Sequence, residues 1–529
     1  KINIVTNMKK ITSILLFLSA LLYVSCDALD LSPEDYYGSG NFWTKEAQVE
    51  GYMNGLHNNL RSSYTMFYVL GEARGGTSRY GTSSLGTSMS YSDPIKNNML
   101  TKDNTGISNW YDLYGRIMQV NHFISEVSNG CSFLSESKKG FYLGQAYGLR
   151  ALYYFMLYKT YGGVPLITDV KVLEGGKISA DALYTERSTP ETILKFIKSD
   201  LEASELNFGN NVTIDRAMWT KYATLMLKAE VYMWSAKVTT GDHQATGNSD
   251  LAIAQTALQP LINQFSLLDN FSEVFSKKAN DEIIFAIRFK DGEATNWAGP
   301  FIYYGNIFEG QRYGRDGKLM QDTLDLKGTV GQFLHEYKKA LWDSYDDEDM
   351  RRDATFMDHY GSAQKEGFGI AMKKGIGSVN SNNQRIFDTD IIVYRYADVL
   401  LMMAEIENAL SGKCANYVNE VRKRAYGKNW HPQFAYTDGS YADNELTILH
   451  ERDKEFVWEG KRWFDVVRMH DANGKSLAFS VAANYPNNET PDERVPLIKE
   501  SEAHKLLWPI DVNTLNNDPK LEQTPGYDK

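Results

Sequence analysis

Cysteine is scarce in this sequence. Cys26, Cys131 and Cys414 are the only three in 529 residues. The two that follow Cys26 lie far apart, so they make no disulfide framework, and their spacing fits no metal site. We expect Cys131 and Cys414 to be isolated buried thiols, with a single disulfide between them as the alternative.

Positive charge is also in short supply. The chain has 56 Lys and Arg against 67 Asp and Glu, a formal net charge of −11. Nucleic-acid-binding proteins need a basic footprint, and the short Lys/Arg clusters of this chain do not make one. The composition therefore argues against nucleic acid as a partner.

Long hydrophobic runs are missing beyond the beginning of the chain. A membrane-spanning helix needs about 18 or more apolar residues, and no later run approaches that length. The early apolar run, 11–24, is of signal-peptide length and follows the basic stretch Met8-Lys9-Lys10. We therefore predict an export signal over residues 1–25, with no helix that spans the membrane.

The end of this predicted signal resembles a bacterial lipoprotein cleavage box, because the small residue Ser25 precedes Cys26. Cys26 would then be the acylated first residue of the mature protein, followed by a tether to residue 46. The alternative is an ordinary signal peptide with an incidental cysteine. We expect a protein anchored to a membrane through lipid.

Aromatic residues are plentiful, with 33 Tyr and 10 Trp. Such side chains fill cores, but they also stack on the apolar C–H faces of sugar rings while their polar ends form hydrogen bonds. The composition therefore favours carbohydrate ligands weakly.

Apolar residues recur at helical spacing through much of the chain. Short breaks such as Gly162-Gly163-Val164-Pro165 separate the predicted helices, so they form antiparallel pairs. Paired helices bury their faces by stacking on the next pair. We predict a mainly α fold with a scaffold of paired helices over about 47–264 and 392–470. Its helices are expected at about 47–61, 110–127, 136–161, 190–206, 217–238, 250–263, 392–410, 416–426, 444–458 and 461–469.

Two segments lack this periodicity. Residues 71–102 are rich in Gly, Ser, Thr and Asn and are expected to form a long loop, of the kind that is usually functional or disordered. From about 280 to 390 a strand-like stretch, 282–288, leads into loops dense in Gly, Asp and aromatic residues. We predict an irregular insertion there that carries few short strands.

Several segments, taken in order, resemble the SusD/RagB family of outer-membrane nutrient-binding lipoproteins. They span nearly the whole predicted mature chain: Cys26 with 29–33 and 41–43, Trp110-Tyr111 with Ile117 and Val120-Asn121, 149–154 leading to 161–166, 394–405, and Glu451-Arg452 with 459–465.

This resemblance implies a single SusD-like domain over 47–529 with four tetratricopeptide-like units, and a binding surface on the irregular insertion. It also implies a non-catalytic protein at the outer membrane, lipid-anchored and facing the cell exterior. The implied partner is a SusC-like TonB-dependent transporter. The implied ligands are oligosaccharides or, in the RagB branch, peptides.

Carboxylates near the end of the chain offer an alternative function, because a pair of them can serve a glycoside hydrolase. Arg452 to Glu455, Glu459 to Arg462 and Asp465 to Arg468 are all three residues apart, which places opposite charges side by side on a helix. We therefore predict structural ion pairs and no enzyme.

No cofactor is expected. The acidic run 343–349 could offer oxygen ligands to Ca²⁺, but it lacks the alternating Asp/Asn and central Gly of a dedicated calcium loop. A solvated charge run is favoured, and a structural Ca²⁺ has no support.

Aromatic residues in the predicted loops are the candidate ligand-binding groups, since a large ring on an irregular surface needs a reason. We predict a stacking platform for sugar rings, with neighbouring polar groups binding hydroxyls. The alternative is that each ring merely packs its own loop. The rings are Trp297, Tyr303, Tyr304, Tyr80 and Tyr91, and the polar groups are Arg79, Asn296, Asn306 and Arg312.

Overall fold

The computed structural model describes residues 42–80, 92–170, 179–296, 298, 310–326, 335–488 and 490–527. Its helices are α2 (Glu46–Ser62), α3 (Thr65–Gly71), α4 (Ser92–Lys96), α5 (Leu113–Asn129), α6 (Glu136–Tyr161), α7 (Pro190–Phe208), α8 (Lys221–Lys237), α9 (Asn248–Leu258), α10 (Glu273–Ser276), α12 (Lys339–Asp343), α13 (Met350–Thr355), α14 (Tyr396–Ser411), α15 (Ala415–Tyr426), α16 (Tyr441–Glu455), α17 (Arg462–Arg468) and α18 (Val512–Asn517).

The strands are short and pair two by two. Each pair is antiparallel, and the pairs are β1 (Ser78–Tyr80) with β3 (His335–Tyr337), β2 (Ile283–Ile287) with β8 (Ile391–Arg395), β4 (Phe356–His359) with β5 (Gly369–Met372), and β6 (Ser378–Val379) with β7 (Arg385–Ile386). The mainly α fold class predicted from the sequence is confirmed.

Local sequence signals explain where the long helices begin and end. The Ser135 hydroxyl accepts a hydrogen bond from the Lys138 amide at the start of α6, and Thr189 caps α7 in the same way with Pro190 just inside the helix. Helix α6 ends at Gly162, whose φ of +74° is strained for other residues. These boundaries agree with the predicted ones.

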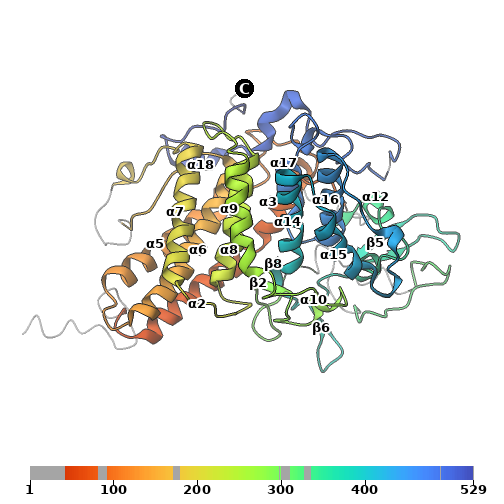
Figure 1. Cartoon of the computed structure of the whole chain (residues 1–529), viewed down its shortest axis with the longest axis horizontal. Helices are drawn as coiled ribbons and strands as arrows, with labels where there is room; N and C mark the ends of the chain where they lie inside the picture. Colours follow the sequence, from red (N-terminus) through yellow and green to blue (C-terminus); the bar gives the residue numbers. More distant parts are fainter. Residues whose placement is uncertain are drawn as a thin grey trace, which may run out of the picture.

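The helices pack as successive pairs. In the described part of the chain, α2 packs on α5, α6 on α7, α8 on α9 and α14 on α15. Helix α9 also contacts α14, so the pairs form one scaffold although the irregular segment separates them in sequence. Figure 1 shows α5 to α9 side by side on one half of the molecule, with α14 to α17 and long loops on the other.

Three predicted boundaries are wrong. Residues 391–395 form strand β8 on β2, not the start of a helix, because three β-branched residues begin the segment. Helix α16 ends at Glu455 and not at residue 458. The segment 71–102 is not all loop, since it contains β1 and α4.

Buried ion pairs hold the C-terminal helices together, but mostly with different partners from those predicted. Asp465 and Arg468 are paired at 2.8 Å as predicted. The other two predicted pairs are wrong because these side chains are buried between elements and find partners across them. Arg452 bonds Asp465, Glu455 bonds Arg395, Glu459 bonds Lys374 and Arg462 bonds Asp453.

The acidic run 343–349 is solvated except at its end. Asp343 and Asp347 are exposed and pair with lysine or arginine at the surface. Asp349 is buried, caps α13 and bonds Arg351 at 2.7 Å, so the prediction of a solvated run is wrong for this residue.

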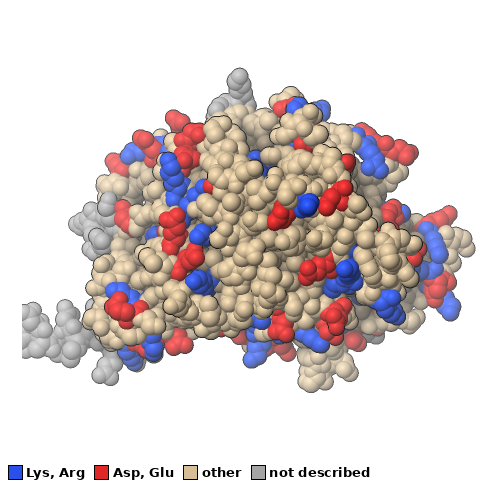
Figure 2. Space-filling view, in the orientation of Figure 1, with Lys and Arg blue, Asp and Glu red and all other residues tan. Residues whose placement is uncertain are grey.

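Cys131 and Cys414 are both buried and free, which confirms the prediction of isolated thiols. No helix among the described residues combines the length and apolar character that crossing a membrane requires. On the face shown in Figure 2, positive and negative side chains are interspersed.

Candidate functional site

A shallow groove lined by aromatic rings lies at the seam between two hydrophobic cores. Tyr64, Phe67 and Tyr68 pack on the large core of the helical scaffold, and Trp458 packs on the smaller core of the irregular half. Ligand sites are common at such junctions. We call this feature the aromatic groove; it is lined by Tyr64, Thr65, Phe67, Tyr68, Val69, Ile391, Trp458, Glu459 and Gly460.

Helix α3 presents three of these rings because of its residue spacing. Met66 and Leu70 are buried and anchor the helix in the core. Tyr64, Phe67 and Tyr68 stand at i, i+3 and i+4, so they share the opposite, half-exposed face. The Tyr64 ring also meets Phe289 edge-on, with 5.1 Å between centroids. The rings are therefore held from behind while one side of the helix stays accessible.

The fourth ring comes from the turn between α16 and α17. Trp458 has φ of +64°, a conformation that non-glycine residues rarely adopt. The buried carboxylate of Glu72 accepts hydrogen bonds from the Trp458 amide at 2.8 Å and the Gly460 amide at 2.9 Å. The Tyr337 hydroxyl donates to the same carboxylate at 2.5 Å. Glu72 thus fixes a strained turn that carries a groove ring.

Close packing of glycines brings this turn against α3. A Cβ on Gly71 would lie 1.9 Å from the Gly460 carbonyl oxygen, and one on Gly460 would lie 2.3 Å from the Phe67 carbonyl oxygen. Gly375 approaches the Trp458 ring in the same way, at 2.3 Å from a Cβ position to Cζ3. Larger residues at these positions would push Trp458 out of the groove wall.

Among the described lining residues, Glu459 is the one carboxylate, and its charge is already compensated. Glu459 is 7% exposed, and its carboxylate bonds Lys374 at 2.5 Å and Arg395 at 2.9 Å. Burial raises the pKa of a carboxyl, but these two cations lower the pKa of Glu459 below its usual range. Glu459 therefore serves as a paired anion behind the rings.

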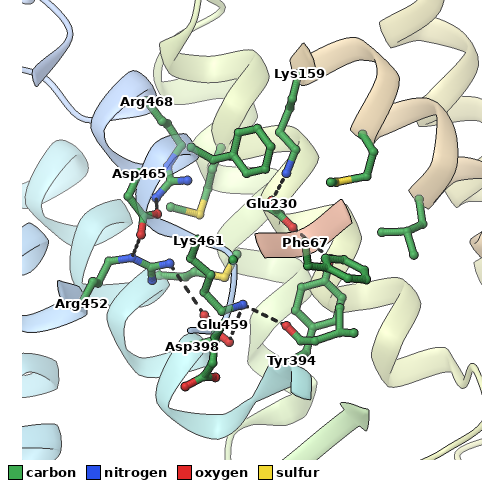
Figure 3. A pocket seen from close by; sticks show the side chains of 17 residues that line it. Phe67, Lys159, Glu230, Tyr394, Asp398, Arg452, Glu459, Lys461, Asp465 and Arg468 are labelled. Carbon is green, nitrogen blue, oxygen red and sulfur yellow. Dashed lines mark hydrogen bonds and ion pairs between the residues drawn. The ribbon is translucent and has the colours of Figure 1, made fainter. Parts of the chain in front are cut away.

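A second cavity lies directly behind the groove and is lined by charged side chains (Figure 3). Phe67 and Glu459 border both spaces. Within the inner cavity Lys461 lies 3.0 Å from Asp398, and Lys159 lies 2.6 Å from Glu230. Asp465 bonds both Arg452 and Arg468 in the same cavity (Figure 3), so this space is largely an internal ion-pair cluster.

A larger cavity, about 380 Å³, opens where α6 and α8 end. Its one tryptophan, Trp234, is 2% exposed, so its ring faces are not accessible for stacking. The Gln523 amide on its wall is used by the Ile510 backbone. Of these three spaces, the groove is the one that combines accessible aromatic rings from several elements.

Most of the site residues predicted from sequence lie outside the described residues. They are Cys26, Tyr91, Trp297, Tyr303, Tyr304 and Asn306. For Tyr80 the structure describes the backbone but not the side chain. Tyr80 pairs with His335 in the β1–β3 ladder, and the His335 ring lies 5.7 Å from the ring of Tyr68. The end of β1 is therefore close to the aromatic groove.

Three predicted residues are described in full. Asn296 is buried; its amide donates to the Thr389 carbonyl and accepts from the Ala298 amide. Arg79 lies 3.9 Å from Glu336 across the ladder. Arg312 donates to His359 Nδ1 at 2.9 Å and to the Gly367 carbonyl at 2.6 Å. Each of these groups has a structural contact, and its ligand-binding role stays a prediction.

The sequence analysis missed all four groove rings. Helix α3 is 7 residues long, too short for a recognisable periodic pattern. The spacing Tyr64, Phe67, Tyr68 was a usable signal, but helical spacing of rings usually indicates core packing. Trp458 was missed because a tertiary contact from Glu72 sets its conformation.

No group of three or more His, Cys, Asp or Glu side chains among the described residues is arranged to hold a metal ion. The expectation that the protein needs no cofactor stays a prediction.

Two family models match most of the chain. The model described as "SusD family" matches residues 281–527, and the model described as "Starch-binding associating with outer membrane" matches residues 29–234. The groove contains residues from both matched regions.

Known proteins similar to this chain carry related names. A crystal structure of a SusD superfamily protein from Bacteroides fragilis is 42% identical, covers 92% of this chain and 100% of its own, and superposes with a TM-score of 0.84. A SusD-like protein of Formosa agariphila is 26% identical over 98% of this chain and 100% of its own. The starch-binding protein SusD of Bacteroides thetaiotaomicron is 24% identical over 72% of this chain and 71% of its own.

Proposed function

Because the chain belongs to the SusD superfamily, we propose that it is a surface lipoprotein that captures oligosaccharides in the aromatic groove and delivers them to a SusC-like TonB-dependent transporter. The observation that carries this proposal is the set of four half-exposed rings, contributed by two separate segments, at the seam of the two cores.

Ring chemistry supports a saccharide ligand. Pyranose rings present apolar C–H faces, and tyrosine and tryptophan offer both a flat apolar face and a polar tip. Tyr64, just before α3, and Tyr68, within it, stand four residues apart, a separation of about 6 Å along a helix axis. This spacing is close to the length of one sugar unit, so neighbouring rings can contact consecutive units of one chain.

The state of the carboxylates around the groove supports a non-catalytic role. Glycoside hydrolysis needs two carboxyl groups free to act as acid and as base or nucleophile. Glu72 is committed to the Trp458 turn, and Glu459 is bound by Arg395 and Lys374. The groove can therefore hold a sugar without cleaving it.

Transfer to a transporter and anchoring at the outer membrane extend the proposal beyond the groove. The family description "associating with outer membrane" supports the location. Cys26 lies outside the described residues, and its acylation rests on the sequence pattern.

In the producing bacterium, Cys26→Ala should release the protein from the membrane fraction and abolish incorporation of labelled fatty acid. Co-purification of a large β-barrel with the wild-type protein would support the transporter role.

The direct test of function is calorimetric titration of the protein begun after Cys26 with oligosaccharides of graded length and linkage. We expect binding in the micromolar to millimolar range to one linkage class, with a negative heat-capacity change. Chromatography of the same mixtures should show no shortened products. Binding by no oligosaccharide, or the appearance of cleaved products, would contradict the proposal.

A further inference from the structure

We infer that the aromatic groove selects uncharged saccharides and discriminates against saccharides that carry carboxylate or sulfate groups. This inference rests on the proposed function and adds the chemical class of the ligand.

The accessible lining of the groove is neutral. The half-exposed residues that form it are Tyr64, Thr65, Phe67, Tyr68, Val69, Ile391 and Trp458. Among the described lining residues, the one ionisable side chain besides the tyrosines is Glu459, which is buried and bonded to two cations. A charged ligand group would find no complementary charge in this lining.

The arginines Arg61 and Arg79, which precede and follow α3 in the chain, each have an acidic partner. Arg61, just before α3, bonds Glu293 at 2.6 Å. Arg79, in β1, lies 3.9 Å from Glu336, which is buried. Neither is available to an anionic ligand unless an existing pair is broken.

The energetic consequence is discrimination by desolvation. Neutral hydroxyl groups that face away from the rings can keep their water, and they carry no charge that has to be compensated. An ionised carboxylate pressed against ring faces loses hydration with no counter-charge in return, which costs several kcal/mol. The groove therefore discriminates against acidic sugars through the cost of desolvating their charge, and it needs no negatively charged lining to do so.

The test compares ligands that differ in one group. A panel of neutral oligosaccharides (starch, xylan, mannan and β-glucan fragments) and acidic ones (pectin, alginate, sialylated and sulfated fragments) is titrated by calorimetry. The neutral binder is then compared with its C6-oxidised form of the same length. We expect the oxidised form to bind at least about tenfold more weakly. The neutral form should keep its affinity between about 50 and about 500 mM NaCl, because no charge pair is made.

A gain-of-function variant sharpens this comparison. Val69 lines the groove on α3 and is half-exposed. Val69→Lys places a cation there and should raise the affinity for the oxidised form in a salt-dependent manner. Val69→Met is the uncharged comparison of similar length at the same position, and the salt-dependent gain for the oxidised form should be confined to Val69→Lys.

The outcomes separate the two claims. An acidic saccharide that binds more tightly than any neutral one, and whose binding is lost in Tyr68→Ala, overturns the inference while the proposed function stands. The absence of binding by either class overturns the proposed function itself. Neutral binding with about tenfold discrimination, removed by Tyr68→Ala, supports both.

Discussion

Glu72 joins three separate parts of the chain. It follows α3, and its carboxylate accepts hydrogen bonds from the Trp458 and Gly460 amides of the turn. The same carboxylate accepts a hydrogen bond from the Tyr337 hydroxyl in β3. Burial raises the pKa of the Glu72 carboxyl, while its hydrogen bonds oppose that shift. The orientation of Trp458 in the groove therefore depends on a buried residue that does not line the groove itself.

Glu72→Gln should weaken ligand binding through this positioning role. The amide nitrogen of glutamine cannot accept one of the backbone N–H groups, so the turn loses at least one hydrogen bond of about 1–3 kcal/mol. We expect the affinity for the neutral oligosaccharide to fall about tenfold when measured by calorimetry at a temperature where the variant is fully folded.

Tyr337→Phe is the matched control, because it removes one hydrogen bond from Glu72 and leaves both turn amides satisfied. Its affinity should stay within about a factor of two of the wild type. If Glu72→Gln binds as tightly as Tyr337→Phe, Glu72 does not position the groove.

At the residue scale, the sequence predicted a carbohydrate ligand, which stays a prediction, but not the residues that carry the groove rings. The abundance of aromatics indicated stacking, and the rings sit on a half-exposed surface. Tyr64 and Tyr68 could not be predicted as groove residues, because their exposure depends on what packs against the other side of α3. Trp458 was out of reach because its φ is set by Glu72, 386 residues away in sequence.

At the scale of elements, buried arginines link strands and helices that sequence separates. Arg395, at the end of β8, bonds Glu282 at 2.7 Å, Glu455 at 2.6 Å and Glu459 at 2.9 Å. Arg424 of α15 reaches the same Glu455. These contacts fix α15, α16 and the Trp458 turn against the β2–β8 ladder.

Arg395→Met should destabilise the protein strongly. Removing one partner of a buried ion pair leaves uncompensated charge and costs about 3–5 kcal/mol in the free energy of unfolding. Lys339→Ala is the control, since the Lys339–Asp343 pair is nearly half exposed and such pairs contribute about 0–1 kcal/mol. Urea denaturation measures both variants, and equal stability of the two would contradict the role given to Arg395.

The ion pairs show that the spacing of charged residues in the sequence can predict that they form ion pairs, but not which residues pair with each other. Charges three residues apart favour pairing on an exposed helix. Arg452, Glu455 and Glu459 are instead buried between elements, where each side chain bonds whichever opposite charge the tertiary fold brings closest. The same limit applies to β8, whose partner strand lies about a hundred residues earlier in the chain.

At the scale of the whole molecule, an ion pair between buried Lys159 and half-buried Glu230 ties the first helical units to the C-terminal half. Glu230 of α8 bonds Lys159 of α6 at 2.6 Å and the Tyr394 hydroxyl of β8 at 2.9 Å. Burial would raise the pKa of the Glu230 carboxyl, but Lys159 and Tyr394 hold it at about 2. This carboxyl is therefore more acidic in the folded chain than in the unfolded one.

The stability of the molecule should fall in acid for this reason. A carboxyl with a lowered pKa stabilises the fold above its ordinary pKa of 4.5, and the stabilisation is lost as pH falls toward 2. For Glu230 the contribution at neutral pH is roughly 3 kcal/mol. Glu230→Gln should lower the unfolding free energy at pH 7 and flatten its decline between pH 4.5 and 2. An unchanged decline would show that other groups govern it.

The mainly α architecture could be predicted at this scale because long helices carry clear periodicity and capping signals, as α6 and α7 do. The groove could not, since it forms where two cores meet and its walls come from residues 64–69, 391 and 458–460. No local pattern in the sequence reports that these three segments converge.

The central claim, that the groove binds a saccharide through its rings, is tested most directly by calorimetry on the double variant Tyr68→Ala, Trp458→Ala. The neutral oligosaccharide that binds the wild-type protein is the ligand, and thermal unfolding confirms that the variant is folded. The account predicts that affinity falls by at least about a hundredfold, from the loss of two stacking surfaces. Unchanged affinity in the folded variant would contradict it and place the binding site elsewhere on the molecule.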